Sequence, residues 1–158
     1  MASVAVENSA TAVTITTNRF GKPGLPPEQN RGGLTFNVSH SGEYALLAFA
    51  AGKSLGVDIE EIRARETMID LAKAILLPRE FAEFERLGEA ERQRVFFRSW
   101  TRKEAFVKGI GEGLSIPLNS VDAEGAPGWS IHDLDVDPRY AAAVAVQAPT
   151  VDLCLWNW

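Results

Sequence analysis

Hydrophobic and polar residues alternate over short stretches near both ends of this chain and follow helical spacing in its middle. Alternation predicts a half-buried strand at Thr11–Thr17, with Val13 and Ile15 on one side. Residues 1–10 have weak patterning, and we expect a loose tail there. Further strands are predicted from β-rich apolar runs at Thr35–Val38, Tyr44–Ala50, Leu55–Ile59, Trp129–Val136, Tyr140–Val146 and Val151–Trp156.

Three helices are predicted between these two groups of strands. Apolar residues at helical spacing indicate a helix over Glu66–Ile75. Pro78 suits the first turn of a second helix that Gly88 ends. A third, long helix begins at Glu89 and meets no further glycine or proline until Gly109. Residues 109–114 are rich in glycine but follow a helix rather than open one, so they predict a flexible turn and not a phosphate loop.

Size and composition indicate one globular domain over residues 1–158. Of its residues, 46% are hydrophobic and 23% charged, as in ordinary globular proteins. The net charge of -5 argues against general nucleic-acid binding, and no apolar run is long enough to span a membrane. The start of the chain lacks the features of a signal peptide, and one cysteine cannot form an internal disulfide, so we expect a cytoplasmic protein. Cys154 lies in an apolar run and is predicted to be a small buried hydrophobe.

The long helix carries an unusual face. Trp100, Glu104 and Lys108 recur at four-residue spacing, which places them along one side of the helix. A core face would continue with leucine or valine. This face therefore indicates contact with something charged.

Two carboxylates at the end of a strand suggest what that charged species is. Asp58 and Glu60 are two residues apart on a strand, so they point the same way and repel each other. A hard divalent cation such as Mg²⁺ would compensate that repulsion, and Glu104 could supply a third carboxylate if the helix faces the strand. The alternative is a solvated strand end with no ligand.

Two other polar groups have competing interpretations. Lys22 lies in a loop over residues 21–33 that holds three prolines and four glycines, where an ordinary solvated lysine is expected. Ser39, His40 and Ser41 are predicted to lie in a tight connection between two strands. Imidazole and hydroxyl groups there could share an anion or phosphate, although a lone histidine is more often structural or solvated.

Placed in order, these segments resemble the 4'-phosphopantetheinyl transferases of the Sfp type. The motifs that carry the resemblance are Gly21–Pro23, Phe36–Ser41, Gly56–Glu60, Trp100–Lys108 and Gly113–Leu118. Their order and separations agree over about Thr14 to Trp156. The resemblance implies an α+β fold in which an antiparallel sheet packs against a long helix. It also implies Mg²⁺-dependent transfer of the phosphopantetheine arm of coenzyme A to a serine of an acyl or peptidyl carrier protein, with release of adenosine 3',5'-bisphosphate.

The resemblance also implies roles for single residues. The metal ligands would be Asp58, Glu60 and Glu104. Lys108 would stabilise the phosphates or, alone or through a water, accept the proton of the attacking serine, and Glu104 is its rival for the role of base. A cation lowers the basicity of a carboxylate bound to it, which favours Lys108 as the proton acceptor. Contacts to coenzyme A would come from Lys22, Ser39, His40 and Lys103.

One departure concerns length. Members of this family usually have two similar α+β halves, and this chain lacks most of the first. Loss of that half would expose apolar surface and remove one wall of the cleft. Three outcomes are open: a homo-oligomer that replaces the half, a fragment of a longer protein, or a non-catalytic module that binds coenzyme A or a carrier protein.

Overall fold

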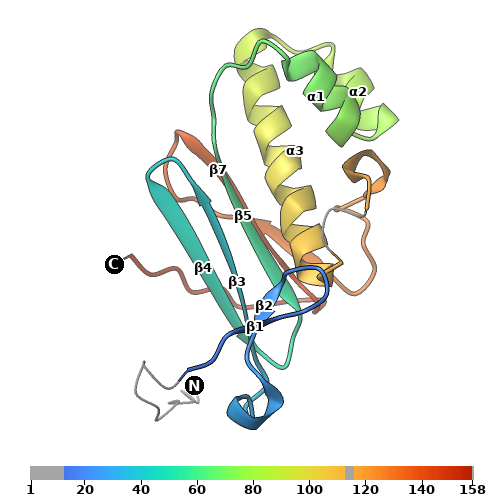
Figure 1. The fold of residues 1–158 in the computed structure, drawn as a ribbon. Helices are drawn as coiled ribbons and strands as arrows, with labels where there is room; N and C mark the ends of the chain where they lie inside the picture. Colours follow the sequence, from blue (N-terminus) through green and yellow to red (C-terminus); the bar gives the residue numbers. More distant parts are fainter. Residues whose placement is uncertain (1–12, 113–115, 158) are drawn as a thin grey trace.

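The computed structural model describes residues 13–112 and 116–157 of the chain (Figure 1). The strands are β1 (Thr16–Thr17), β2 (Pro23–Gly24), β3 (Leu34–Ser41), β4 (Tyr44–Ala51), β5 (Leu55–Glu61), β6 (Ser130–Asp133) and β7 (Tyr140–Val146). The α-helices are α1 (Met68–Ile75), α2 (Pro78–Phe84) and α3 (Glu89–Ile110), and two short 3-10 helices are η2 (Pro27–Gln29) and η4 (Leu118–Ser120). The predicted α+β class, with antiparallel strands beside a long helix, is confirmed.

The strands form two main antiparallel groups. β3 and β4 make a hairpin in which Ser41 pairs with Tyr44, so the turn consists of Gly42 and Glu43. β5, β7 and β6 make a sheet in which β7 is central and Asp58 pairs with Ala143. Figure 1 shows β5 between the hairpin on one side and α3 on the other, and contacts join β5 to both. β5 is therefore the strand to which the rest of the fold is attached.

The helix α3 packs closely on β5 and β7 because both sides of the contact are small. Ala105 of α3 clusters with Ala143 and Ala145 of β7. A Cβ atom at Gly56 would lie 2.1 Å from the carbonyl oxygen of Ala105, so only glycine permits this approach. The helix ends where Gly111 takes a φ of 79°. This contact fixes the distance between the two elements that carry the candidate site.

A separate apolar cluster holds α1 and α2 beside α3 (Figure 1). Phe84, Phe96 and Phe97 are fully buried in it. Burying a phenylalanine side chain contributes about 2 to 3 kcal/mol relative to leaving it exposed. The helices α1 and α2 thus anchor the upstream half of α3, and its downstream half is free to face β5.

The outer face of the hairpin is apolar and exposed. Val38, Leu47 and Phe49 have exposed fractions of 42%, 53% and 58%. Val38 and Leu47 are cross-strand partners, which makes the face continuous. The hairpin therefore carries a continuous apolar surface that none of the described residues cover.

Several sequence predictions differ from the structure at the ends of the chain. Of the predicted first strand Thr11–Thr17, the structure describes residues 13–17, and among these Thr16–Thr17 alone form a ladder. Val13 and Ile15 are exposed, because this segment pairs with β2 and not with the main sheet. Val151–Trp156 is not a strand, and it pairs with none of the described strands. Cys154 is accordingly exposed, and its predicted burial was wrong. The predicted tail at residues 1–10 and the glycine-rich residues 113–115 lie outside the described ranges.

Within residues 13–112 and 116–157, no helix combines the length and the apolar character that crossing a membrane requires.

Candidate active site

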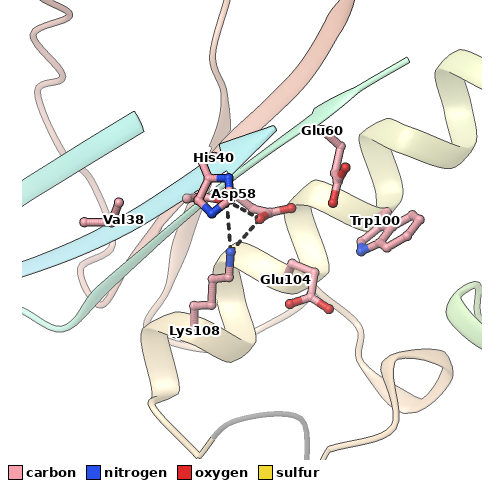
Figure 2. A pocket seen from close by; sticks show the side chains of 8 residues that line it. Val38, His40, Asp58, Glu60, Trp100, Glu104 and Lys108 are labelled. Carbon is pink, nitrogen blue, oxygen red and sulfur yellow. Dashed lines mark hydrogen bonds and ion pairs between the residues drawn. The ribbon is translucent and has the colours of Figure 1, made fainter. Parts of the chain in front are cut away.

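A pocket of about 360 Å³ opens where β3, β5 and the downstream half of α3 meet (Figure 2). Its lining residues are Val38, Ser39, His40, Asp58, Glu60, Trp100, Glu104 and Lys108. The structure therefore brings together in one place the predicted strand carboxylates, the predicted helix face and two of the residues predicted on the first hairpin.

Strand and helix periodicity explain the convergence. Asp58 and Glu60 are two residues apart on β5 and point to the same side. Trp100, Glu104 and Lys108 are four residues apart on α3 and lie along one face. The close contact at Gly56 places that face opposite the strand carboxylates.

Lys108 and Asp58 form the strongest charge pair of the pocket. The Lys108 Nζ donates to Asp58 Oδ1 at 2.6 Å and to Ser39 Oγ at 3.1 Å (Figure 2). The Ser39 hydroxyl donates to the same Oδ1 at 2.8 Å. Asp58 is only 3% exposed, and its Oδ2 is buried without a hydrogen-bond partner among the described residues. An oxygen of this kind is a ready acceptor for a further cation or donor.

Burial raises the pKa of all three pocket carboxyl groups. For Asp58, burial raises the pKa more than Lys108 lowers it. For Glu60 and Glu104, burial raises the pKa and the negative charge of Asp58 raises it further. Burial therefore makes the charged form of each carboxyl group less favourable than it is in water.

The chemistry of this donor set fits a divalent cation. Hard cations take carboxylate oxygens, and a bound cation would offset the cost of burying these charges and the repulsion of Glu60 and Glu104 by Asp58. The side chains are not converged, however: among the described residues, no group of three or more His, Cys, Asp or Glu side chains forms a ready metal site. Lys108 instead compensates Asp58 in this structure. That the three acids hold a metal stays a prediction.

Ser39 and His40 lie in β3 and not in the predicted turn. The predicted end of this strand at Val38 was wrong. The strand continues to Ser41, because Ser39 and Ser41 accept hydrogen bonds from main-chain N–H groups of β5. Ser39 is 7% exposed, whereas His40 points outward and is exposed at the edge of the pocket. His40 is thus accessible to a ligand, whereas the Ser39 hydroxyl is hydrogen-bonded to Asp58 and Lys108.

Lys22 is not a solvated loop lysine. Its Nζ donates to the carbonyl oxygen of Leu55 at 2.9 Å and to that of Gly109 at 2.7 Å. It thereby ties the start of β5 to the end of α3, and burial lowers its pKa. A cation at the carboxyl end of a helix is also favoured by the helix dipole. Lys22 is not among the residues that line the pocket, and its contact with coenzyme A stays a prediction.

Lys103 lies in the protein interior rather than in the pocket. It is 1% exposed, and its Nζ pairs with Glu80 at 2.7 Å. It also donates to the carbonyl oxygens of Ile75 and Leu118. Its three donors are therefore all used within the protein, and its contact with a phosphate stays a prediction.

Replacing Lys103 with methionine should consequently lower stability and not ligand affinity. The change removes the ammonium group that pairs with the partly buried Glu80 and donates to two carbonyl groups, which costs about 3 kcal/mol. Thermal melting and calorimetric binding of coenzyme A would measure the two effects. A variant with unchanged melting but weakened coenzyme binding would contradict the structural role.

Comparison with known proteins shows the family of this chain. The model of the family described as the 4'-phosphopantetheinyl transferase superfamily matches residues 54–146, which is more than half of the chain. The chain belongs to the 4'-phosphopantetheinyl transferase superfamily. The matched range includes Asp58, Glu60, Glu104 and Lys108, the charged groups of β5 and α3 that line the pocket.

Curated proteins of the superfamily are similar over most of this chain. A 4'-phosphopantetheinyl transferase from Nostoc, HetI, is 37% identical over 135 residues, which is 80% of this chain and 57% of HetI. Sfp of Bacillus subtilis is 29% identical over 152 residues, or 87% of this chain and 64% of Sfp. AcpT of Escherichia coli is 34% identical over 139 residues, or 86% of this chain and 69% of AcpT. The chain thus spans little more than half the length of HetI and about two thirds of the other two.

Sequence reasoning missed the role of Ser41. Its hydroxyl donates to Glu60 Oε2 at 3.2 Å and accepts the N–H of Glu61 at 3.0 Å. The signal was available in the alternation of β3, where Asn37, Ser39 and Ser41 are polar at every second position. The pattern cannot say, without the fold, that this polar side faces a neighbouring strand and not water.

Proposed function

We propose that this chain transfers the phosphopantetheine arm of coenzyme A to a serine of an acyl or peptidyl carrier protein, with Mg²⁺ as the cation. The observation that carries the proposal is the meeting of Asp58, Glu60, Glu104 and Lys108 in one pocket of a member of this superfamily. Carboxylates and an ammonium group in one pocket suit a diphosphate with its cation.

In the proposed reaction, the serine oxygen of the carrier attacks the phosphorus that bears the pantetheine arm. A phosphorus–oxygen bond forms to the serine while the bond from that phosphorus to the bridging oxygen of the diphosphate breaks. The bridging oxygen leaves with adenosine 3',5'-bisphosphate, and the serine proton passes to a base. The protein must therefore stabilise negative charge on the leaving phosphate and accept one proton.

The three pocket carboxylates would hold the cation, which supplies positive charge beside the diphosphate. His40, exposed at the rim, would contact a phosphate of coenzyme A. Trp100 lines the same pocket and offers an apolar wall for the arm. Each of these assignments rests on the side chains facing one pocket.

The position of Lys108 favours the phosphate role over the role of base. An amino group that donates to a carboxylate at 2.6 Å and to a hydroxyl is held as an ammonium ion, which has no lone pair to accept a proton. Proton transfer to Lys108, or to a water that it holds, would require it to leave Asp58 first. Glu104 remains the rival acceptor, since burial raises its pKa toward neutrality.

Mass spectrometry tests the proposed transfer directly. Incubation of the chain with coenzyme A, Mg²⁺ and an apo carrier protein should increase the mass of the carrier by one phosphopantetheine arm. The reaction without Mg²⁺, and a carrier whose acceptor serine is alanine, serve as controls. A carrier that stays unmodified at high enzyme concentration would reject the proposal for this chain.

A second candidate is a non-catalytic module that binds coenzyme A or a carrier protein. The observation in its favour is the exposed apolar face at Val38, Leu47 and Phe49, which borders the pocket through Val38. Calorimetric binding of coenzyme A without any modification of the carrier would support this candidate, and turnover would remove it.

A further inference from the structure

The strand β5 has one edge that no strand pairs with. Its other edge carries the ladder to β7, and among the described residues no main-chain ladder joins β3 to β5. Figure 1 shows β3 running beside β5. Val57 and Ile59 are at most 1% exposed, so water cannot serve the N–H groups on that edge. Buried main-chain groups of this kind need other partners.

Side chains of β3 supply those partners. Asn37 Oδ1 accepts the N–H of Val57 at 2.9 Å, and Ser39 Oγ accepts that of Ile59 at 3.4 Å. Ser41 Oγ accepts the N–H of Glu61 at 3.0 Å. We call these three residues, Asn37, Ser39 and Ser41, the polar ladder. It replaces main-chain hydrogen bonds by side-chain hydrogen bonds at a spacing of two residues.

The two serines of the polar ladder each hold a carboxylate as well. Ser39 donates to Asp58 Oδ1 at 2.8 Å, and Ser41 donates to Glu60 Oε2 at 3.2 Å. A hydroxyl has one proton to donate, and the amide groups that contact these hydroxyls are donors only. The amides of β5 therefore occupy the acceptor side of each hydroxyl and direct its proton to the carboxylate.

Asn37 is the member of the polar ladder that bonds to β5 without a hydrogen bond to a pocket carboxylate. It accepts the N–H of Val57 and is 5% exposed, but its side chain has no contact with an acid. The same kind of link between β3 and β5 thus occurs once without, and twice with, a carboxylate of the pocket.

We propose that Ser39 and Ser41 are positioning residues, which orient the Asp58 and Glu60 carboxylates for a divalent cation and are themselves oriented by the amides of β5. The inference rests on the proposed function, because it assumes that these carboxylates hold the cation. Ser41 gives the cleaner test, since Ser39 also contacts Lys108.

Binding of Mn²⁺ to the full chain, measured by calorimetry without coenzyme A, tests the proposal. Replacing Ser41 with alanine should weaken Mn²⁺ binding about 10-fold or more, as loss of a residue that orients a metal ligand does. Ser41→Thr keeps the hydroxyl at a strand position that tolerates threonine and should restore most of the affinity. Asn37→Ala should lower the melting temperature by roughly 2 to 10 °C and leave Mn²⁺ affinity unchanged.

The outcomes separate this inference from the proposed function. If the unaltered chain does not bind Mn²⁺, the proposed cation site fails, and the positioning role fails with it. If the unaltered chain binds and Ser41→Ala binds equally well, the positioning role alone is wrong. Equal weakening by Ser41→Ala and Asn37→Ala, with no recovery in Ser41→Thr, would show that the polar ladder only supports the fold and would also overturn the inference.

Discussion

Replacement of Glu104 by glutamine should reduce modification of the carrier about 100-fold or more without unfolding the protein. The change keeps the shape of the side chain but removes the charge that helps to hold a cation next to the diphosphate. Rates measured over a range of Mg²⁺ concentrations, together with thermal melting, would report the two effects separately. Glu83→Gln makes the same chemical change at an exposed site of α2 and should alter neither.

The stability of the Glu104→Gln variant, measured without Mg²⁺, should also depend less on pH than that of the unaltered protein. Burial raises the pKa of Asp58, Glu60 and Glu104 above the values of the unfolded chain. The folded state therefore binds more protons, and stability falls as pH rises from the unfolded pKa values through the raised folded ones. Removing one of the three acids should make that fall smaller. A variant that melts well below the unaltered protein, with its Mg²⁺ response intact, would instead identify Glu104 as a structural residue.

Local periodicity was sufficient to predict the two elements that carry the acids. The four-residue spacing of Trp100, Glu104 and Lys108 and the two-residue spacing of Asp58 and Glu60 each define one side of an element whatever the tertiary fold is. The sequence could not place the two sides opposite each other. That placement depends on Gly56, where β5 approaches the backbone of α3 too closely for any side chain.

The lysines show why candidate ligands were harder to predict. A lysine side chain is long and flexible, so its sequence position does not determine what its ammonium group reaches. Lys22 reaches carbonyl groups of β5 and α3, and Lys103 reaches a buried glutamate, although both lie in motifs of the family. Only the short side chains of the pocket, fixed by their backbone, could be assigned from spacing with any precision.

The predicted strand near the end of the chain was wrong because its pairing also depends on the tertiary fold. Val151–Trp156 has the composition of a strand but pairs with no strand among the described residues. Strand propensity describes how well a residue fits a sheet and not which segments of the chain come together. The polar ladder is the opposite case, because polar residues typical of a turn continue a strand when a neighbouring edge needs their hydrogen bonds.

Replacement of Lys108 by methionine is the second change with a large expected effect, and it should act on stability before it acts on catalysis. Asp58 is 3% exposed, and Lys108 is its ionic partner. Removing one member of such a pair costs about 3 kcal/mol, because the carboxylate must stay uncompensated or take up a proton. For a chain of this size the melting temperature should fall by about 6 to 12 °C.

Mg²⁺ should restore much of this loss. With the ammonium gone, a cation is the remaining source of positive charge for Asp58, so it stabilises the variant more than the unaltered protein. Melting curves with and without Mg²⁺ would measure the difference. Lys108→Met that melts like the unaltered protein without Mg²⁺ would show that the pair does not compensate Asp58.

Arginine at the same position separates charge from proton transfer. Lys108→Arg keeps a positive charge but cannot give up its proton at ordinary pH. If Lys108 serves the phosphates, the arginine variant should retain stability and a substantial part of the activity that methionine loses. If both variants are equally inactive while the arginine variant is stable and binds coenzyme A normally, Lys108 is the proton acceptor, and the ion pair with Asp58 must open during each turnover.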